Sequence, residues 1–382
     1  MTQSTKTLLG FYVVSIALLF IVVEVMSILA TRYLSRSGIF FDKGIIQQSY
    51  SEYLRVRDPT LGWGPPAHAV DAFGARKDSS AYSNSHSCLD VYGDSFTWGG
   101  EVRAEDAWAA RLSDLLKCRV RNFGVDGYGS DQAYMRFLNA REHSPVVFLD
   151  HWSDNVLRNV NQFRNFLIPE PQYAFKPRFV LHDAELSLLP VPSVPQGELQ
   201  AFFDRPQLVL HHEFFLPNSS WGPSIASFPY SWSLLRSYGN WMIRAKLRGQ
   251  PIYADFYSPE HPSHALVLTS AILTDFYFKA SAQGIRAVVV LFPACRDFAE
   301  KKRLGRFPYE PLSRELAAAH VRFLDMGELI AAKYHDDFRR LYTTCAGHFN
   351  AQGNQIEAQI ISEYIHREKL IEQEPDPGGT LK

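Results

Sequence analysis

The chain has 382 residues, 46% of them hydrophobic, which is enough for one large domain with insertions or for two domains. Its 39 Lys and Arg residues nearly balance its 40 Asp and Glu residues, and the formal net charge is −1. This balance offers no basic patch, so the composition argues against a nucleic-acid partner.

The first predicted element is a membrane-spanning helix at residues 8–30, LLGFYVVSIALLFIVVEVMSILA, which contains one charge, Glu24. A helix needs about 20 mostly apolar residues to cross a bilayer. The apolar run exceeds the roughly 7–15 residues of a signal-peptide core, and no small-residue cleavage site is clear before Thr31. We therefore expect residues 1–31 to form a cytoplasmic tip and an uncleaved signal anchor. A cleaved signal peptide and a buried hairpin helix are the alternatives.

Strands and helices are predicted to alternate after a Gly- and Pro-rich connector and lead-in at 32–87. Strands are expected at 88–92, 118–124, 145–150, 286–293 and 321–325, and helices at 105–116, 130–142, 265–283, 311–320 and 351–369. An insertion rich in aromatic residues and Pro occupies about 156–260, and 370–382 form a flexible tail. Alternation of this kind predicts an α/β domain over 88–369, with a parallel sheet covered by helices on both faces.

Several polar residues and a glycine follow the predicted strands, at the sheet edge where open α/β folds place their sites. Ser95 follows the first strand in YGDSFTWGG, Gly127 the second in NFGVDGYGSDQ, and Asp154 and Asn155 the third in DHWSDN. His348 precedes the last helix in CAGHFNAQGN. A serine here can act as a nucleophile if a base reaches it and N–H groups surround the oxyanion. An N-cap serine, a glycine-rich turn and a solvated loop histidine are the alternative interpretations.

Together these four segments resemble the SGNH/GDSL hydrolase family. The resemblance implies a nucleophile at Ser95, a base at His348, and an oxyanion hole made by the N–H groups of Ser95 and Gly127 with the Asn155 side chain. It also implies a three-layer αβα, flavodoxin-like domain that acts on esters of lipids, small molecules or carbohydrates. No metal or cofactor is expected. The candidate supporting residues are Asp94, Asp154 and Cys345.

Two positions depart from the family's usual blocks. The third block is usually Gly-x-Asn-Asp, but here Asp154 stands at the asparagine position and Asn155 follows it. Because an ionised carboxylate cannot donate a hydrogen bond, we expect Asn155 to be the donor. In the last block the acid three residues before His348 is replaced by Cys345. A backbone carbonyl would then have to hold the histidine tautomer, as in a Ser-His dyad, or the site would be inactive.

The four cysteines allow a second interpretation of Cys345. Cys295 follows a predicted strand at the same sheet edge, so these two residues could form a disulfide that fixes the His348 loop. Pairing of Cys88 with Cys118 on the first two strands is also open. Disulfides would require an oxidising compartment, which favours a periplasmic or other extracytoplasmic domain. The positive-inside rule does not decide the orientation, because basic residues flank both ends of 8–30.

The expected function is a serine-dependent ester hydrolase or O-acyltransferase that acts on acyl (acetyl) esters of a carbohydrate or polysaccharide. The membrane contact through 8–30 and the aromatic-rich insertion motivate the carbohydrate substrate, although those aromatic residues could equally pack the insertion itself. The alternative is a catalytically silent, SGNH-like carbohydrate-binding or assembly protein, motivated by the two departures from the family's blocks.

Overall fold

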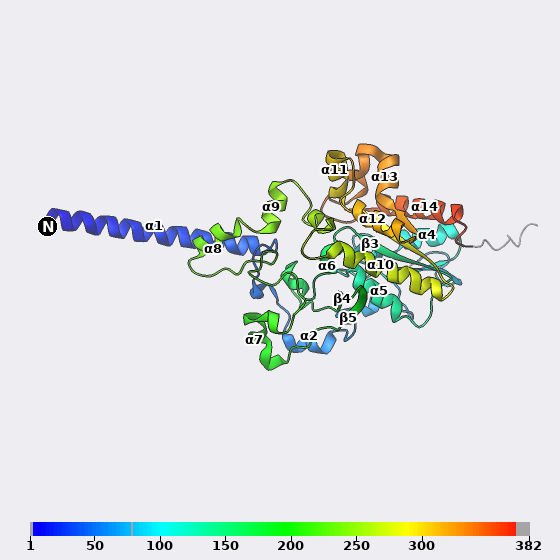
Figure 1. Cartoon of the computed structure of the whole chain (residues 1–382), viewed down its shortest axis with the longest axis horizontal. Coiled ribbons are helices and arrows are strands. Elements are labelled where there is room, and N and C mark those ends of the chain that lie inside the picture. Colours follow the sequence, from blue (N-terminus) through cyan, green and yellow to red (C-terminus); the bar gives the residue numbers. More distant parts are fainter. Residues whose placement is uncertain (1–2, 78, 372–382) are drawn as a thin grey trace, which may run out of the picture. The chain divides into compact units, whose positions relative to one another are not determined.

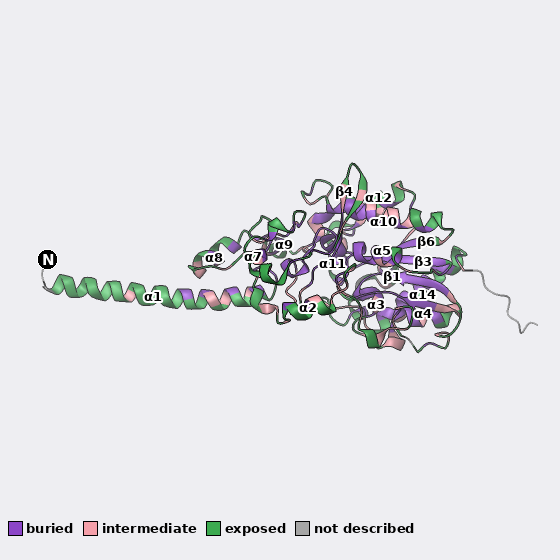
Figure 2. Cartoon of the chain, turned by 90° about the horizontal axis from the view of Figure 1, so that it is seen from below, coloured by how far each residue is buried: buried purple, intermediate pink, exposed green. Residues whose placement is uncertain are grey.

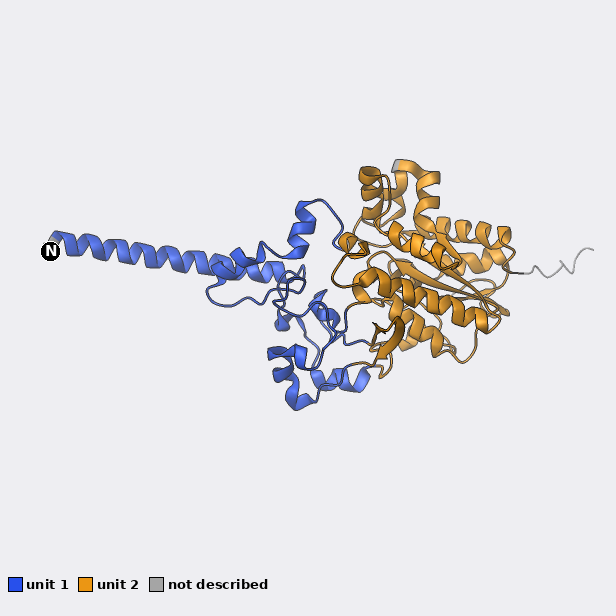
Figure 3. Cartoon of the chain, in the orientation of Figure 1, with its two compact units in different colours: residues 1–57, 161–176, 192–252 blue, residues 58–160, 177–191, 253–382 orange. Residues whose placement is uncertain are grey.

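The computed structural model of the chain describes residues 3–77 and 79–371, which form two compact units (Figures 1 and 3). Unit 1 comprises 1–57, 161–176 and 192–252, and unit 2 comprises 58–160, 177–191 and 253–382. The insertion expected at 156–260 is therefore divided: 161–176 and 192–252 belong to unit 1, while 156–160, 177–191 and 253–260 belong to unit 2. Of the expected tail at 370–382, residues 372–382 lie outside the described residues.

Unit 2 is built on a five-stranded parallel sheet with the strand order β2-β1-β3-β6-β7. The strands are β1 (Ser87–Tyr92), β2 (Arg119–Asn122), β3 (Val146–Trp152), β6 (Arg286–Phe292) and β7 (Phe323–Asp325). Numbered along the chain among themselves, they follow the 2-1-3-4-5 order of flavodoxin-like folds. In this order the strand order along the sheet reverses between β1 and β3, and a ligand crevice lies at such a switch point. The predicted fold class is confirmed.

Helices cover both faces of this sheet, which makes unit 2 a three-layer αβα structure (Figure 2). Helices α5, α10 and α12 pack on one face, and α4, α13 and α14 form the layer on the other. The central strands carry fully buried apolar runs, such as Val147–Leu149 and Val288–Val290, because helices exclude water from both sides. The helices of unit 2 are α3 (Ser95–Trp98), α4 (Trp108–Leu116), α5 (Ser130–Leu138), α6 (Asn155–Arg158), α10 (Ala265–Ala282), α11 (Cys295–Leu304), α12 (Glu310–Ala318), α13 (Met326–Tyr334) and α14 (Ala351–Arg367).

The ten strands and helices predicted from periodicity are present, with ends shifted by a few residues. Elements that were not predicted are short or directly abut a strand. Helix α13 begins at the residue after β7, where the Asp325 side chain accepts a hydrogen bond from the Glu328 N–H and caps the helix. Helix α11 begins three residues after β6. The antiparallel hairpin of β4 (Arg178–His182) and β5 (Glu185–Leu189) is a further addition to unit 2.

Two disulfides link elements of unit 2. Cys88 pairs with Cys118, and Cys295 pairs with Cys345, with Cα separations of 6.0 and 5.1 Å. Both pairings that the sequence left open are thus present, and no free cysteine remains among the described residues. Closing chain loops of 30 and 50 residues stabilises the fold by about 4 kcal/mol each in the chain-entropy estimate.

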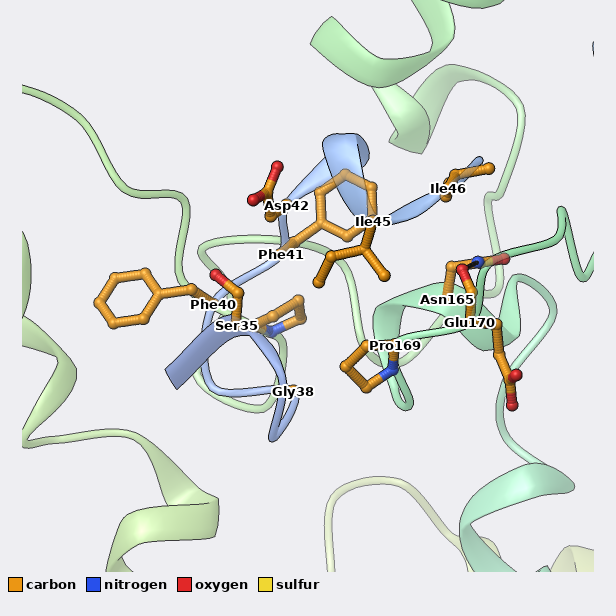
Figure 4. Close-up of a pocket in the computed structure, with 11 residues that line it drawn as sticks. Ser35, Gly38, Phe40, Phe41, Asp42, Ile45, Ile46, Asn165, Pro169 and Glu170 are labelled. Atoms are coloured by element: carbon orange, nitrogen blue, oxygen red, sulfur yellow. Dashed lines mark hydrogen bonds between the residues drawn. The ribbon is translucent and has the colours of Figure 1, made fainter. Parts of the chain in front are cut away.

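Unit 1 contains the long N-terminal helix and a small aromatic core. Its helices are α1 (Gln3–Ser35), α2 (Tyr50–Val56), α7 (Leu199–Asp204), α8 (Tyr230–Ser237) and α9 (Trp241–Leu247). Phe163 packs against Phe175 and Phe202, so a large part of the aromatic content of the insertion forms this core. A small cavity of about 10 Å³ lies at the C-terminal end of α1, between Ser35, Phe41 and the loop at Pro169 (Figure 4). It has room for little more than one water molecule.

Among the described residues, α1 is the one helix long and apolar enough to cross a membrane. It has 33 residues, and at 1.5 Å per residue it is about 50 Å long, which exceeds the hydrocarbon core of roughly 30 Å. Its apolar side chains between Leu8 and Leu29 are largely exposed.

Candidate active site

The turn after β1 places Ser95 at the carboxyl edge of the sheet, as predicted. Ser95 is the first residue of α3, and the side chain of Asp94 caps this short helix by accepting a hydrogen bond from the Phe96 N–H at 2.8 Å. Gly93 is required by packing, because a Cβ at this position would lie 1.9 Å from Thr97 Oγ1 and 2.9 Å from Asp150 Cβ. Asp94, predicted as a supporting residue, therefore has a structural role in forming the turn.

Ser95 and His348 meet although they lie far apart in the sequence. The two atoms Ser95 Oγ and His348 Nε2 are 2.7 Å apart, a hydrogen-bonding distance for a nucleophile and its base. The other ring nitrogen, Nδ1, lies 3.0 Å from Glu101 Oε1. Because a carboxylate only accepts, Nδ1 carries the proton, and Nε2 is left to accept from the Ser95 hydroxyl. The three side chains thus form a Ser-His-Glu chain of hydrogen bonds.

Glu101 reaches the histidine because the chain reverses immediately after α3. Gly99 adopts a left-handed conformation with φ +77°, and a Cβ there would lie 2.8 Å from Arg76 Nη1. The N–H groups of Gly99 and Gly100 both donate to the Ser95 carbonyl, at 3.0 and 3.1 Å. This double contact closes α3 and directs the next residue, Glu101, back toward the sheet edge.

The charge state of Glu101 suits the role of an orienting acid. Partial burial alone would raise the pKa of Glu101, but hydrogen bonds from Thr343 and His348 hold it below its ordinary value. The carboxylate is therefore ionised at neutral pH. Gly347 leaves room for it, since a Cβ at that position would lie 2.9 Å from Glu101 Oε2.

Glu101 was not predicted, because the acid was sought three residues before His348, where Cys345 stands. Cys345 forms a disulfide with Cys295, the first residue of α11. Cys345 therefore cannot act as an acid. The expectation of a backbone carbonyl beside the imidazole, as in a Ser-His dyad, was wrong, because His348 Nδ1 contacts the Glu101 carboxylate. The acidic residues soon after the Gly99-Gly100 pair are the only sequence signal that pointed to this loop.

His348 is carried on a narrow turn that is fixed at both ends. Tyr342 and Phe349 form an antiparallel bridge with stacked rings, and the Thr343 N–H donates to the His348 carbonyl at 2.9 Å. The Tyr342 hydroxyl donates to the carbonyl of Pro293, just beyond β6. The disulfide at Cys345 adds a covalent link from the same turn to α11. These contacts hold the imidazole in place without help from a nearby aspartate.

The reversed third block separates its two polar residues into different roles. Asp154 Oδ2 lies 3.5 Å from Arg158 Nε, and the same arginine lies 3.5 Å from Asp94 Oδ2, which forms a buried ionic cluster. Asn155 is fully buried at the start of α6, and its Nδ2 and Oδ1 atoms have no hydrogen-bond partner among the described residues. A buried carboxamide without partners costs free energy unless a ligand satisfies it. Asp154 is thus engaged in the ionic cluster, whereas the Asn155 carboxamide has no hydrogen-bond partner among the described residues.

Gly127 lies in the turn between β2 and α5, with a φ of +80° that favours glycine. The preceding residue, Asp126, accepts a hydrogen bond through its carbonyl from Trp63 Nε1 at 2.9 Å. The ring of Trp63 also packs edge-on against Tyr128, whose hydroxyl donates to the Trp63 carbonyl. The lead-in segment thus fixes this turn and places an indole ring beside it.

Protonatable groups lie directly behind the nucleophile turn. Asp150 on β3 is buried and accepts a hydrogen bond from Thr97 Oγ1 at 2.6 Å. Burial raises the pKa of Asp150 well above its ordinary value, and burial also raises that of the nearby Glu357. His151, which follows Asp150 on β3, shares hydrogen bonds with the hydroxyls of Ser130 and Tyr257. Burial lowers the pKa of His151 to about 3. Burial therefore favours the uncharged form of all three groups. No cluster of three or more metal-ligating side chains occurs in 3–77 or 79–371.

Comparison with known proteins finds matches among solved structures, at low sequence identity. No protein-family model and no curated protein sequence matches the chain. The solved structures that match the chain include a lipase/acylhydrolase from Enterococcus faecalis, 10% identical, covering 76% of this chain and 100% of the other, with a TM-score of 0.37. A member of the lipolytic protein G-D-S-L family from Veillonella parvula is 10% identical, with coverages of 73% and 98% and a TM-score of 0.34. AlinE4, an SGNH-hydrolase family esterase, is 11% identical, with coverages of 74% and 96% and a TM-score of 0.31.

Two of these neighbours are named as members of the GDSL or SGNH families, which the sequence motifs resemble. Their identities and TM-scores are low, so the chemistry of this chain is inferred below from its own site geometry.

The Glu101→Gln variant tests the acid. The amide would donate to Nδ1 and stabilise the wrong imidazole tautomer, so we expect kcat to fall by about 10⁴ with little change in KM. Steady-state kinetics on a chromogenic ester would measure this. Glu105→Gln, in the same loop but paired with Arg103 at the surface, is the matched control and should keep wild-type kcat. Unchanged turnover in Glu101→Gln would show that this carboxylate does not orient the base.

The Asp150→Asn variant tests the raised pKa of the buried carboxyl that accepts from Thr97. Since the folded-state pKa of Asp150 is raised, its stabilising contribution is complete below the unfolded pKa, about 3.9, and is lost as pH rises toward the folded pKa. We expect the free energy of unfolding to fall more steeply from pH 5 to 8 in the wild type than in the variant, by up to about 1.4 kcal/mol per pH unit. Denaturant unfolding at four pH values would measure it.

The control for this experiment is Asp183→Asn, at an exposed turn between β4 and β5. It should leave the pH dependence of the free energy of unfolding as in the wild type. Equal slopes for Asp150→Asn and the wild type would mean that Asp150 is ionised in the folded protein.

Proposed function

We propose that the protein is a serine-dependent ester hydrolase in which Ser95 is the nucleophile, His348 the general base and Glu101 the acid that orients the imidazole. The observation that carries this proposal is the continuous contact from Ser95 Oγ to His348 Nε2, at 2.7 Å, and from Nδ1 to Glu101, at 3.0 Å. Glu101 also removes one of the two reasons for considering a catalytically silent protein, which was the missing acid.

In the first half-reaction, Ser95 Oγ attacks the ester carbonyl carbon while His348 Nε2 takes the hydroxyl proton. Glu101 stabilises the imidazolium that forms, without taking its proton. The carbonyl oxygen becomes an oxyanion, which the N–H groups of Ser95 and Gly127 and the Asn155 side chain stabilise as donors. When the tetrahedral intermediate collapses, the carbon–oxygen bond to the alcohol breaks, and His348 returns the proton to the leaving oxygen.

In the second half-reaction, an acceptor hydroxyl attacks the acyl-Ser95 ester. His348 takes the acceptor's proton and then delivers it to Ser95 Oγ as the acyl group leaves. Water as the acceptor gives hydrolysis, and a sugar hydroxyl gives O-acyl transfer by the same steps. The donors that stabilise the oxyanion act in both half-reactions, because a tetrahedral intermediate of the same geometry forms in each.

For the substrate we propose an acyl, in particular acetyl, ester of a carbohydrate or polysaccharide. Trp63 supports this, because its half-exposed indole lies beside the Gly127 turn, and an aromatic face there offers a surface for a sugar ring. Phe96 lies against the His348 ring, with the ring centroids 4.8 Å apart. Trp152 is stacked on Phe96, also with a centroid distance of 4.8 Å. These rings provide an apolar wall beside the nucleophile.

For the location we propose a single-pass membrane protein, anchored through 8–30, whose globular part lies outside the cytoplasm. The length and apolar surface of α1 support the anchor. The two disulfides support the compartment, because such bonds persist in oxidising environments and are rare in the cytosol.

The Ser95→Ala variant tests the nucleophile. The detergent-solubilised protein should release the chromophore from p-nitrophenyl acetate and acetate from an acetylated oligosaccharide, and the variant should lose both activities because no acyl-enzyme can form. Ser130→Ala, which removes a buried hydroxyl bonded to His151, is the control for folding and should keep the activity. Acetate release by Ser95→Ala at the wild-type rate would refute the proposed mechanism.

The Asn155→Ala variant tests the oxyanion donor. Loss of one preorganised donor should lower kcat by roughly 10²–10³, because the interaction forms only with the developing oxyanion. Asp154→Asn, at the neighbouring position, should have the smaller effect on kcat, since its partner in the structure is Arg158. The reverse order of the two effects would assign the donor to position 154.

A further inference from the structure

Glu24, the one charge in the apolar run of α1, has specific partners in unit 1. Its side chain is only 6% exposed and accepts hydrogen bonds from the Tyr230 N–H at 2.6 Å and the Ser231 N–H at 3.2 Å. The Ser231 hydroxyl donates to the same carboxylate. Tyr230 and Ser231 are the first two residues of α8, so Glu24 caps α8 from a different helix. Helices α1 and α8 lie side by side in both views (Figures 1 and 2).

Helix α8 exposes its large apolar residues and buries its small polar ones. Ser233 and Ser237, four residues apart, are buried, whereas Trp232, Leu235 and Tyr238 just beyond the helix end are 57%, 64% and 69% exposed. A helix on the surface of a water-soluble domain has the opposite pattern. This pattern is that of a helix whose outer face contacts lipid, because helices in a bilayer pack through small residues.

Helix α1 has the same distribution on the side that faces the rest of unit 1. Glu24, Ser27, Thr31 and Ser35 are buried, and their spacing of three and four residues places them on one face of the helix. The apolar residues on its other sides are exposed. The polar and small residues of both helices are thus turned inward, and the apolar residues outward.

The depth of this contact along α1 can be estimated from the helix rise. Ala30 ends the apolar run six residues after Glu24, so the start of α8 lies about 9 Å inside that end. Phe228, before α8, reaches one turn further, because its ring packs edge-on against Phe20 with centroids 6.1 Å apart. Amphipathic elements in a membrane surface are buried to a similar depth, roughly 5–10 Å.

We propose that residues 225–238 form a second membrane element, which dips into the leaflet at the C-terminal end of α1 and is held there by Glu24. The lipid bilayer is the partner that covers Phe228, Trp232 and Leu235, because this apolar face continues the exposed apolar face of α1. Trp232 and Tyr238 suit the interface between acyl chains and headgroups. Arg236, exposed on the same helix, can reach anionic headgroups. The inference rests on the proposed membrane crossing of α1.

Introduced cysteines can test this proposal in the full-length protein, since all four native cysteines are in disulfides. Three single variants, Leu235→Cys, Ile16→Cys and Leu188→Cys, would each carry a nitroxide label in vesicles of phosphatidylcholine and phosphatidylglycerol. All three residues are exposed, in 225–238, in α1 and in β5 of unit 2 respectively. Electron paramagnetic resonance would compare collisions of each label with oxygen, which concentrates in lipid, and with a water-soluble nickel chelate.

The expected result is that labels at positions 235 and 16 collide several-fold more with oxygen than with nickel, and that the label at 188 shows the reverse. A lipid signal at 16 with a water signal at 235 would overturn the second element and leave the anchor intact. Protection of 235 from both reagents would mean that protein covers this face, which also overturns the proposal. A water signal at 16 would refute the anchor and the proposal together.

The role of Glu24 has its own test in the Leu235→Cys background. Glu24→Leu removes the acceptor of the α8 N–H groups, so nickel collisions at the 235 label should increase at least twofold and the label should become more mobile. Glu24→Gln keeps a carbonyl acceptor and should leave the label in lipid. No difference between Glu24→Leu and the unsubstituted background would refute the holding role of Glu24.

Discussion

The position of Ser95, the proposed nucleophile, depends on how closely the backbone segments approach one another at the end of β1. A side chain at Gly93 would collide with Thr97, and one at Gly124, at the end of β2, would lie 2.4 Å from the Trp98 nitrogen. The absence of a side chain at these two glycines therefore lets α3 begin directly at the carboxyl end of β1. The first residue of that helix, Ser95, is 8% exposed, so its hydroxyl is held in one place with little water around it. The histidine turn, the acid loop and the third strand are all arranged around this point.

The proposed acid Glu101 and the proposed nucleophile Ser95 lie on the same short segment, six residues apart, and the proposed base His348 comes from near the C-terminal end of the chain. In this arrangement the loop after α3 replaces the C-terminal turn as the source of the carboxylate. The C-terminal turn, relieved of that function, carries a disulfide where the acid would stand. The imidazole is thus oriented by its hydrogen bond to Glu101, and the turn that carries it is fixed by the Cys295–Cys345 disulfide.

Much of unit 2 could be predicted from periodicity, because buried parallel strands read as apolar runs and the covering helices as spacings of three and four. The meeting of Ser95 with His348 was also predicted, since both follow elements whose ends share one sheet edge. Glu101 could not be, because its approach depends on the left-handed Gly99 and on two hydrogen bonds to the Ser95 carbonyl, which leave no periodic signal. The fold of unit 1 was missed for a similar reason. Its segments come from three separate stretches of the chain. They are joined by aromatic packing and by the buried Glu213, which accepts hydrogen bonds from the backbone N–H groups of Gln162 and Phe163.

The short distance along the chain between Ser95 and Glu101 has a consequence for how such enzymes are recognised in genomes. A search that requires an aspartate three residues before the histidine would reject this chain, or would class it as a degenerate relative without activity. A pattern that pairs the Gly-Asp-Ser segment with an acidic residue soon after a following Gly-Gly would retain it. In chains classed as inactive because they lack the C-terminal acid, the loop after the nucleophile should therefore be searched for an acidic residue.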